Sequence, residues 1–318
     1  MDYQIEVDQA DTRLDQFITS VFDSVSRSQA QNLIRKNQVT VNGKSCKPAY
    51  KLQIDDWVRV DISDAFDNLS IQPEYIEFDV LHEDTEILVV DKPANLIAHP
   101  APGVSSGTLV NGLLNRYGNW VRTLDRNGIV HRLDKNTTGV MVVAKTTGAV
   151  QHLSEQFKEH TTNRRYIALV CGTPKQPSAT IDTWVHRSRQ DWRKMMVTKG
   201  DGRRAITHYR VLESFGRFSL VDLTLDTGRT HQIRLHLSHI GYPIVGDPVY
   251  GGGEKRALND ATSSLVRQSF LDLGRQALHA RSLEFRHPLT QESVIYRSPL
   301  PVDIQSVIMT LSNPSDFA

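Results

Sequence analysis

The stretch HRLDKNTTGVMVVAK, residues 131–145, joins a run of polar and charged residues to an apolar segment. Residues 139–144 have the β-branched content of a buried strand. A single carboxylate, Asp134, comes shortly before that strand. Two interpretations are open: Asp134 hydrogen bonds to backbone amides of its own turn, or it is held at the mouth of a strand to do chemistry. Taken alone, the stretch favours the turn.

The composition is that of an ordinary globular protein. The chain has 318 residues, 39% of them hydrophobic, which is enough for two domains. No apolar run reaches the roughly 18 to 20 residues of a membrane span, and the N-terminus lacks the layout of a signal peptide. We therefore expect a cytoplasmic protein with no membrane partner. Two cysteines, Cys46 and Cys171, cannot form a disulfide framework, so reduced thiols are expected.

The formal net charge is only +1, but basic residues gather in two parts of the chain. The first part has six basic residues and no acid: Arg27, Arg35, Lys36, Lys44, Lys47 and Lys51. The second has eight basic residues against two acids: Arg187, Arg189, Arg193, Lys194, Lys199, Arg203, Arg204 and Arg210. Two separate basic surfaces suit a polyanion that touches both. Solvated protein surface is the alternative for either part alone.

The pattern of the chain predicts two domains and a linker. In residues 1–62, two helical segments precede strands at residues 39–41 and 56–60, and Asn42-Gly43 is a strong hairpin-turn signal. Residues 63–76 are acidic and turn-rich, which is typical of a linker. Residues 77–318 carry most of the remaining strand-like and helix-like segments and form the expected second domain.

The second domain reads as an α+β fold. Strands are expected at residues 77–82, 87–91, 139–144, 165–171, 205–212, 218–225, 282–285 and 294–296. Helices are expected at residues 108–116, 148–160, 230–239 and 302–311. Many adjacent strands in mixed order with helices favour a mixed, mainly antiparallel sheet that helices flank.

A second polar segment, residues 227–236, is expected to open a helix. Arg234 then lies one turn into the helix, where its permanent charge could hold a carboxylate such as Asp134. Read alone, Arg234 is as compatible with an ordinary surface position. The spacings of His231, His236 and His239 do not match helical zinc ligands, which disfavours a metal-dependent hydrolase.

Five segments, in order, resemble the motifs of the RluA-type pseudouridine synthases. They are VVDKPANLIAHPAPG at residues 89–103, HRLDKNTTG at 131–139, RRYIALVCG at 164–172, TGRTHQIRLHLSHIGYPIVGDPVYGG at 227–252 and RQALHARSLEFRHP at 275–288. The resemblance covers about residues 76–300. Residues 11–60 resemble the S4-type RNA-binding module that many members of this family carry.

The resemblance implies that the chain isomerises uridine to pseudouridine in RNA, without a cofactor or a metal. By the same resemblance the catalytic aspartate is Asp134, the active-site tyrosine is Tyr166, and the arginine that pairs with the aspartate is Arg234. Arg132 is expected to enter the space that the displaced base leaves. Further RNA contacts are expected at His131, Arg229, Arg27, Arg35, Lys36 and Lys44.

Within this family, KNTTGVMVVAKT and VGDPVYGGG are most similar to the RluD-like subgroup, which acts on large-subunit (23S) rRNA at the stem-loop called helix 69. Asn136 departs from the acid that is common in this subgroup. The alternatives are an RluC-like enzyme with other 23S rRNA targets, or a non-catalytic RNA-binding factor of ribosome assembly. We expect a monomer whose partner is 23S rRNA, either free or within the assembling large ribosomal subunit.

Overall fold

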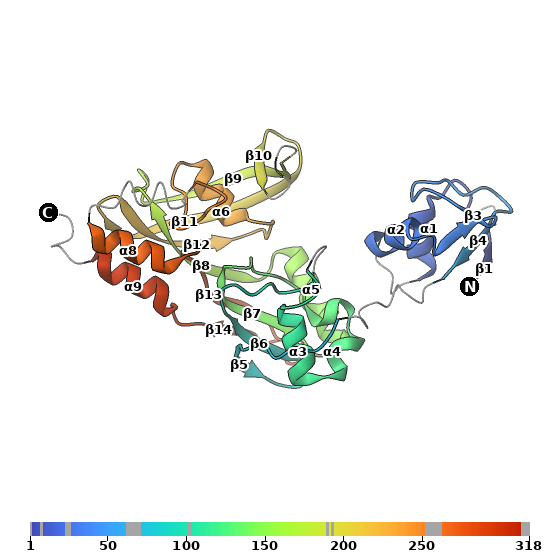
Figure 1. Ribbon diagram of the computed structural model, residues 1–318, viewed down its shortest axis with the longest axis horizontal. Coiled ribbons are helices and arrows are strands. Elements are labelled where there is room, and N and C mark those ends of the chain that lie inside the picture. The colour runs from blue at the N-terminus through green and yellow to red at the C-terminus, as the bar shows by residue number, and fades with distance from the viewer. Residues whose placement is uncertain are drawn as a thin grey trace. The chain divides into compact units, whose positions relative to one another are not determined.

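The computed structural model describes residues 2–6, 9–22, 27–61, 71–100, 104–188, 191, 194–251 and 263–312. The chain divides into two compact units, Met1–Gln72 and Pro73–Ala318 (Figure 1). Residues 63–70 of the expected linker, and Arg189 and Arg193, lie outside the described residues. None of the helices in the described ranges combines the length and the apolar content that crossing a bilayer requires.

The first unit packs two helices against a four-stranded antiparallel sheet with the order β1-β4-β2-β3. Its elements are β1 (Asp2–Gln4), α1 (Leu14–Val21), α2 (Arg27–Arg35), β2 (Val39–Val41), β3 (Lys44–Ser45) and β4 (Trp57–Val60). The hairpin at Asn42-Gly43 is confirmed, because both residues have the positive φ, 51° and 73°, that a type I′ turn requires. Asp15 of α1 is fully buried and accepts bonds from Arg27 (3.1 Å) and Gln31 (2.8 Å) of α2, which ties the helices together.

The second unit is built on a ten-stranded sheet with the order β10-β9-β11-β12-β8-β13-β7-β6-β5, in which β14 also pairs with β13. The strands are β5 (Asp79–Glu83), β6 (Ile87–Lys92), β7 (Thr138–Ala144), β8 (Asn163–Cys171), β9 (Ser178–Arg187), β10 (Met195–Thr198), β11 (Arg203–Phe215), β12 (Phe218–Leu225), β13 (Leu278–Arg286) and β14 (Ser293–Arg297). Among these strands only β13 and β7 pair in parallel, so the expected mixed, mainly antiparallel sheet is confirmed.

Helices flank this sheet. They are α3 (Leu109–Tyr117), α4 (Asn119–Thr123), α5 (Thr147–Glu159), α6 (Gln232–His239), α8 (Ser264–Leu273) and α9 (Val302–Leu311). Helix α5 packs on β7 and β13, and α6 packs on β10 and β11, where Leu235 joins a core with Val185 and Ala205. Helices α8 and α9 lie side by side, in orange and red (Figure 1).

The sequence patterns missed several elements, notably β9, β10 and α8. In strand β9 only Ile181 and Val185 are buried, and the other side chains are polar or partly exposed. The alternation of apolar and polar residues that predicts a strand is therefore weak. Helix α6 begins at Gln232 rather than at residue 230. His231 adopts left-handed backbone angles (φ 56°, ψ 21°) and therefore cannot continue a right-handed helix.

Candidate active site

Asp134 lies in a loop that leads into β7, a strand whose residues are all buried. The backbone carbonyl of Asp134, and not its carboxylate, accepts the amide of Thr137 (3.0 Å). Side chains from distant segments hold the rest of the loop: Lys92 donates to the carbonyl of Lys135 (3.1 Å), Arg275 to the carbonyl of Asn136 (3.1 Å) and Gln276 to the hydroxyl of Thr137 (3.3 Å). The turn is thus closed by other groups, and the carboxylate extends away from it.

Lys92 anchors this loop to the end of β6. It is fully buried, and its ammonium also donates to the carbonyls of Pro93 (2.7 Å) and Leu96 (2.8 Å). Burial lowers the pKa of Lys92 to about 7, and the nearby charge of Asp134 opposes that shift. The loop is therefore held by a buried group whose hydrogens all have acceptors.

Arg234 brings the carboxylates of Asp134 and Asp247 together. Its Nη1 donates to Asp134 Oδ2 (3.0 Å), while Nε and Nη2 form a two-bonded contact with Asp247 (2.7 and 3.0 Å). Asp247 is fully buried, and its Oδ1 also accepts the amides of Val249 and Tyr250. Burial disfavours the charged guanidinium, but Asp247 and Asp134 outweigh this effect and raise the pKa of Arg234. Arg234 is consequently a fixed cation beside Asp134.

His231 lies on the other side of Asp134, with Nε2 at 4.0 Å from Oδ1. Its Nδ1 is 3.0 Å from the hydroxyl of Tyr250, which accepts the amide of Met195 (2.8 Å). The Tyr250 oxygen accepts from Met195 and can donate its own hydrogen to Nδ1; in that tautomer the ring proton is on Nε2 and faces Asp134. Burial lowers the pKa of His231, and Asp134 opposes this shift.

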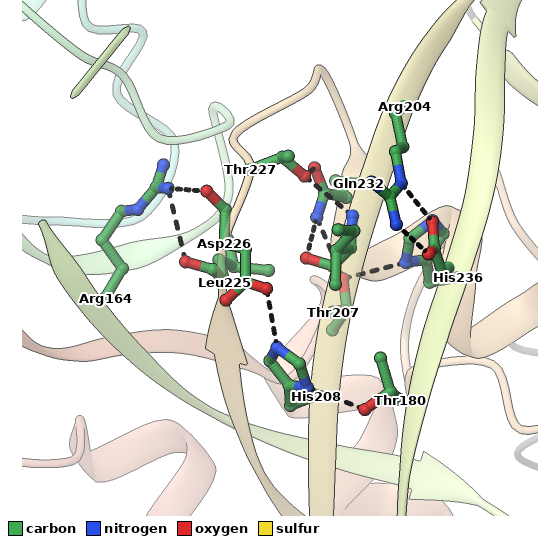
Figure 2. Close-up of polar contacts among 12 residues, drawn as sticks. Arg164, Thr180, Arg204, Thr207, His208, Leu225, Asp226, Thr227, Gln232 and His236 are labelled. Atoms are coloured by element: carbon green, nitrogen blue, oxygen red, sulfur yellow. Dashed lines mark hydrogen bonds and ion pairs between the residues drawn. The ribbon is translucent and has the colours of Figure 1, made fainter. Parts of the chain in front are cut away.

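Tyr166 and Arg164 project from β8 toward the same region. Alternate residues of a strand share one face, and both side chains are buried, with 8% and 7% of their surface exposed. Burial raises the pKa of Tyr166, and the charge of Asp134 adds to the effect while Arg164 opposes it. Figure 2 shows Arg164 beside Leu225 and Asp226, where β12 ends, and both backbone carbonyls accept from its Nη2.

One cavity of about 480 Å³ is lined by Asp134, Arg234, His231, Tyr166 and Arg164. Six residues expected from the sequence meet in its wall: Asp134, Tyr166, Arg234, Arg132, His131 and Arg229. The wall also contains Arg126, Lys158 and Arg164, and Asp134 is the only carboxylate among the described residues that line it. A volume of this size can enclose a small ligand or a single nucleotide, and the charge of the wall suits an anionic one.

His131 has a packing role in this wall. Its Nε2 accepts the amide of Val142 in β7 (3.0 Å), and its ring stacks on Phe157 of α5 with centroids 4.4 Å apart. Burial lowers the pKa of His131 to about 3, and Arg164 adds to the effect, so the ring is neutral near pH 7. In contrast, Arg132 is exposed at the rim of the cavity, and Arg229 donates to the carbonyl of Arg204 (3.1 Å).

The remaining four expected RNA contacts lie in the first unit. Arg27, Arg35, Lys36 and Lys44 are all exposed. Arg27 forms an ion pair with Asp15 at 3.1 Å, so part of its guanidinium is engaged within the protein. The other three lie at the end of α2 and beside the hairpin turn, on the same small unit.

The sequence patterns missed three side chains of this arrangement: Asp247, Tyr250 and Arg164. Residues 246–248 have the composition of a turn, and nothing local indicates that a buried carboxylate there meets an arginine 13 positions earlier. For Arg164 a signal existed, because it stands two residues before Tyr166 and shares its strand face. In the described part of the chain, no group of three or more His, Cys, Asp and Glu side chains is arranged to hold a metal ion.

Comparison with known families agrees with the fold. The family model described as RNA pseudouridylate synthase matches residues 86–239, and the S4 domain model matches residues 12–58. Asp134, Tyr166 and Arg234 all fall within the first match, whereas Asp247 lies beyond it.

Individual relatives extend over nearly the whole chain. The uncharacterized RNA pseudouridine synthase YlyB of Bacillus subtilis is 39% identical over 313 residues, which is 98% of each protein. The ribosomal large subunit pseudouridine synthase D of Pseudomonas aeruginosa is 41% identical, over 92% of this chain and 89% of its own length. Among solved structures, human RNA pseudouridylate synthase domain containing 4 matches with a TM-score of 0.56 and 25% identity, over 73% of this chain and 92% of its own.

Proposed function

The chain belongs to the RluA-type family of RNA pseudouridine synthases, and we propose that it isomerises uridine in large-subunit (23S) rRNA, within the stem-loop called helix 69. Its activity as an RNA pseudouridine synthase follows from the family. The choice of rRNA is supported by relatives named ribosomal large subunit pseudouridine synthase D, at 40% and 41% identity over most of the chain. Residues 1–62 are proposed as the RNA-binding domain, 63–76 as the linker and 77–318 as the catalytic domain.

The reaction sets the geometric demands on the site. The bond between N1 of uracil and C1′ of ribose breaks, the base turns, and C5 forms the new bond to C1′. The proton of C5 leaves and N1 gains one, so no group is imported. A uridine in folded RNA must first leave its stack, which costs a few kcal/mol. The cavity around Asp134 is large enough to receive it.

In this proposal Asp134 is the reacting carboxylate, and Arg234 pairs with it and orients it. The support is the 3.0 Å contact with Arg234, which Asp247 holds from its other side. A carboxylate in this position can attack the nucleotide or remove a proton from the ribose. Tyr166 offers its ring to the uracil and its hydroxyl to the rearranged base. Arg132, exposed at the rim, is proposed to fill the space that the flipped base leaves.

Positive charge supports the binding of RNA by both units. Arg229 lies in the cavity wall, and Arg35, Lys36 and Lys44 are exposed on the first unit, where they are proposed to contact phosphates together with Arg27. His131 is proposed to contact the RNA from the wall of the cavity. Phosphate contacts of this kind are independent of sequence and weaken with salt. The proposal includes a single chain that acts in the cytoplasm, on free rRNA or on the assembling large subunit.

The observation that carries the proposal is the contact between Asp134 and Arg234 inside a cavity that Tyr166 also lines. Its test is Asp134→Asn, which keeps the shape of the side chain and removes its charge. We expect no tritium release from 5-tritiated uridine RNA, together with RNA affinity close to that of the wild type. Asp182→Asn is the matched control, because Asp182 is an exposed carboxylate paired with Arg204. Measurable turnover by Asp134→Asn would contradict the assigned role.

The rRNA target needs a separate experiment. Pseudouridines are mapped in rRNA from cells that lack this protein and from cells complemented with the wild type or with Asp134→Asn. We expect the modifications of helix 69 to disappear and to return only with the wild-type protein. Loss at other 23S rRNA sites would replace helix 69 by an RluC-like target set, and an unchanged map would overturn the rRNA proposal.

A further inference from the structure

The guanidinium of Arg164 is buried in the cavity wall with little to neutralise it. Only 7% of the residue is exposed. Its Nη2 donates to the carbonyls of Leu225 and Asp226 at 3.4 and 3.3 Å, both long for hydrogen bonds of this type (Figure 2). Its Nε is buried and has no hydrogen-bond partner among the described residues. The guanidinium therefore has hydrogen-bond donors that the described residues leave unused.

The carboxylate of Asp226, whose backbone carbonyl accepts from Arg164, is engaged elsewhere. Asp226 accepts from His208 Nε2 at 2.9 Å, as Figure 2 shows, and no carboxylate in the described ranges forms an ion pair with Arg164. The ring of Phe157 lies beneath the guanidinium, 5.8 Å from its centre, and offers only a weak cation–π contact. Buried charges in proteins are normally paired. An unpaired one that lines a cavity is accordingly a candidate to receive an anion.

The absence of a side chain at Gly228 leaves room in the wall for this guanidinium. A Cβ atom at Gly228 would lie 2.5 Å from Arg164 Nη1, so a larger residue there would displace the arginine. Stacking on Phe157 and bonding to the end of β12 set its orientation before any ligand arrives. An arginine held in this way presents its planar fork to an oxyanion with little further ordering.

The geometry points to a specific ligand: we propose that Arg164 binds one of the two RNA phosphates that flank the target uridine. The inference rests on the proposed function. Phosphates are the charged groups of RNA, whereas uracil is neutral before the reaction, so a phosphodiester is the group that best matches a desolvated guanidinium. Arg164 and Tyr166 are two residues apart on β8, hence about 7 Å along the strand. This separation suits a base on Tyr166 and a phosphate of the same nucleotide on Arg164.

The cavity wall supports this choice. Besides Arg234, which pairs with Asp134, it holds Arg126, Arg132, Lys158 and Arg229 near Arg164. The wall is thus positive on balance, which favours RNA backbone. Arg164 differs from the exposed cations because its burial protects the contact from water and salt. It would act as a positioning residue that sets where the ribose stands relative to Asp134.

The test removes the charge either from the RNA phosphate or from Arg164. A helix 69 stem-loop carries a single methylphosphonate, which is uncharged, at the phosphate 5′ or 3′ to the target uridine. Its affinity for the wild type and for Arg164→Met is measured by fluorescence anisotropy. We expect the modified RNA to bind the wild type about 10- to 100-fold more weakly at one of the two positions, as for the loss of a hydrogen bond to a charged group. For Arg164→Met the same modification should change the affinity less than about twofold, because the partner is already gone.

Two further variants keep this test interpretable. Arg165→Met is the control, since Arg165 lies on the opposite face of β8 and pairs with Asp222 at 2.6 Å; it should remain fully sensitive to the methylphosphonate. Arg164→Lys keeps a charge without the fork, and it takes the place of Arg164→Met if the latter loses cooperative melting. For Arg164→Lys we expect the methylphosphonate to weaken RNA binding by more than about twofold, but by less than it does for the wild type.

The outcomes are distinguishable. Equal sensitivity of wild type and Arg164→Met at both positions would overturn the inference. A loss confined to the rate of isomerisation from bound RNA, with unchanged affinity, would also overturn it, and would assign Arg164 to the charge that develops on uracil. Coupling between Arg164 and the phosphate in a stem-loop that the wild type binds but does not isomerise would support the phosphate contact, while it would contradict the proposed substrate.

Discussion

Asp247→Asn tests whether a buried carboxylate holds Arg234 against Asp134. In the wild type, Arg234 donates to Asp247 Oδ2 from Nε (2.7 Å) and to Oδ1 from Nη2 (3.0 Å), and Asp247 is fully buried. An asparagine can keep the oxygen that accepts Nη2. Its amide nitrogen then faces the Nε hydrogen, so one charge-assisted bond is replaced by two opposed donors.

The expected magnitude follows from this loss of a buried partner. Breaking a buried ion pair from one side costs about 3 to 5 kcal/mol. Arg234 keeps Asp134 as a second partner at 3.0 Å, so the lower end applies. At 2 to 4 °C per kcal/mol for a unit of this size, a loss of about 3 kcal/mol lowers the melting temperature by about 6 to 12 °C. The looser Arg234 should reduce kcat by about 10- to 100-fold, because small misplacements near reacting groups have effects of that size.

The assays are thermal melting and multiple-turnover tritium release at saturating RNA, which measures kcat. Asp222→Asn is the matched control: Asp222 is also buried and paired, with Arg165 at 2.6 Å, but its strand neighbour Leu223 is the residue that pairs with Tyr166. Asp222 therefore points to the other face of the sheet. It should lose stability and keep kcat. If Asp247→Asn melts with the wild type and keeps its kcat, the role given to Asp247 is wrong.

Three further predictions concern other parts of the chain. Burial lowers the pKa of His236 to about 4, so the stability of its neutral form is complete above the unfolded value near 6.5 and is lost as the pH falls toward 4; urea midpoints should drop over this window, and less so in His236→Gln. Tyr166→Leu should slow pseudouridine formation at least about tenfold in single-turnover assays, since stacking on a base contributes about 1 to 3 kcal/mol, whereas Tyr166→Phe should keep RNA affinity; a fully active leucine variant would argue against the stacking role. Asp15→Asn removes the negative charge and one of the two acceptor oxygens of the carboxylate that joins α1 to α2, and it should speed hydrogen exchange of both helices, while the melting of the second unit stays unchanged.

Elements whose signal is local are predictable from the sequence. Apolar runs with β-branched residues predicted β6, β7, β8 and β12, and Asn42-Gly43 predicted the hairpin of the first unit. Both patterns can be read from the sequence because the apolar run of a buried strand and the residue types of a tight turn involve only neighbouring residues. Strand β9 was missed because it buries few residues, and its apolar and polar residues do not alternate strongly.

The sequence also located candidate groups without deciding where they point. Asp134 had two local interpretations, and Arg234 was equally compatible with the surface. The two are 100 positions apart, and their 3.0 Å contact exists only because α6 and the loop before β7 are brought together in the second unit.

The buried groups that hold other side chains in place are recognisable from the three-dimensional arrangement and not from local sequence. Asp247 lies in a segment with the composition of a turn, and its value as a partner depends on complete burial beside Arg234. The unpaired charge of Arg164 depends on the end of β12, on Gly228 and on Phe157, three segments that its own neighbourhood in the sequence does not contain. Electrostatic effects of this kind arise from distance and desolvation in three dimensions, and neither is encoded in residue spacing along the chain.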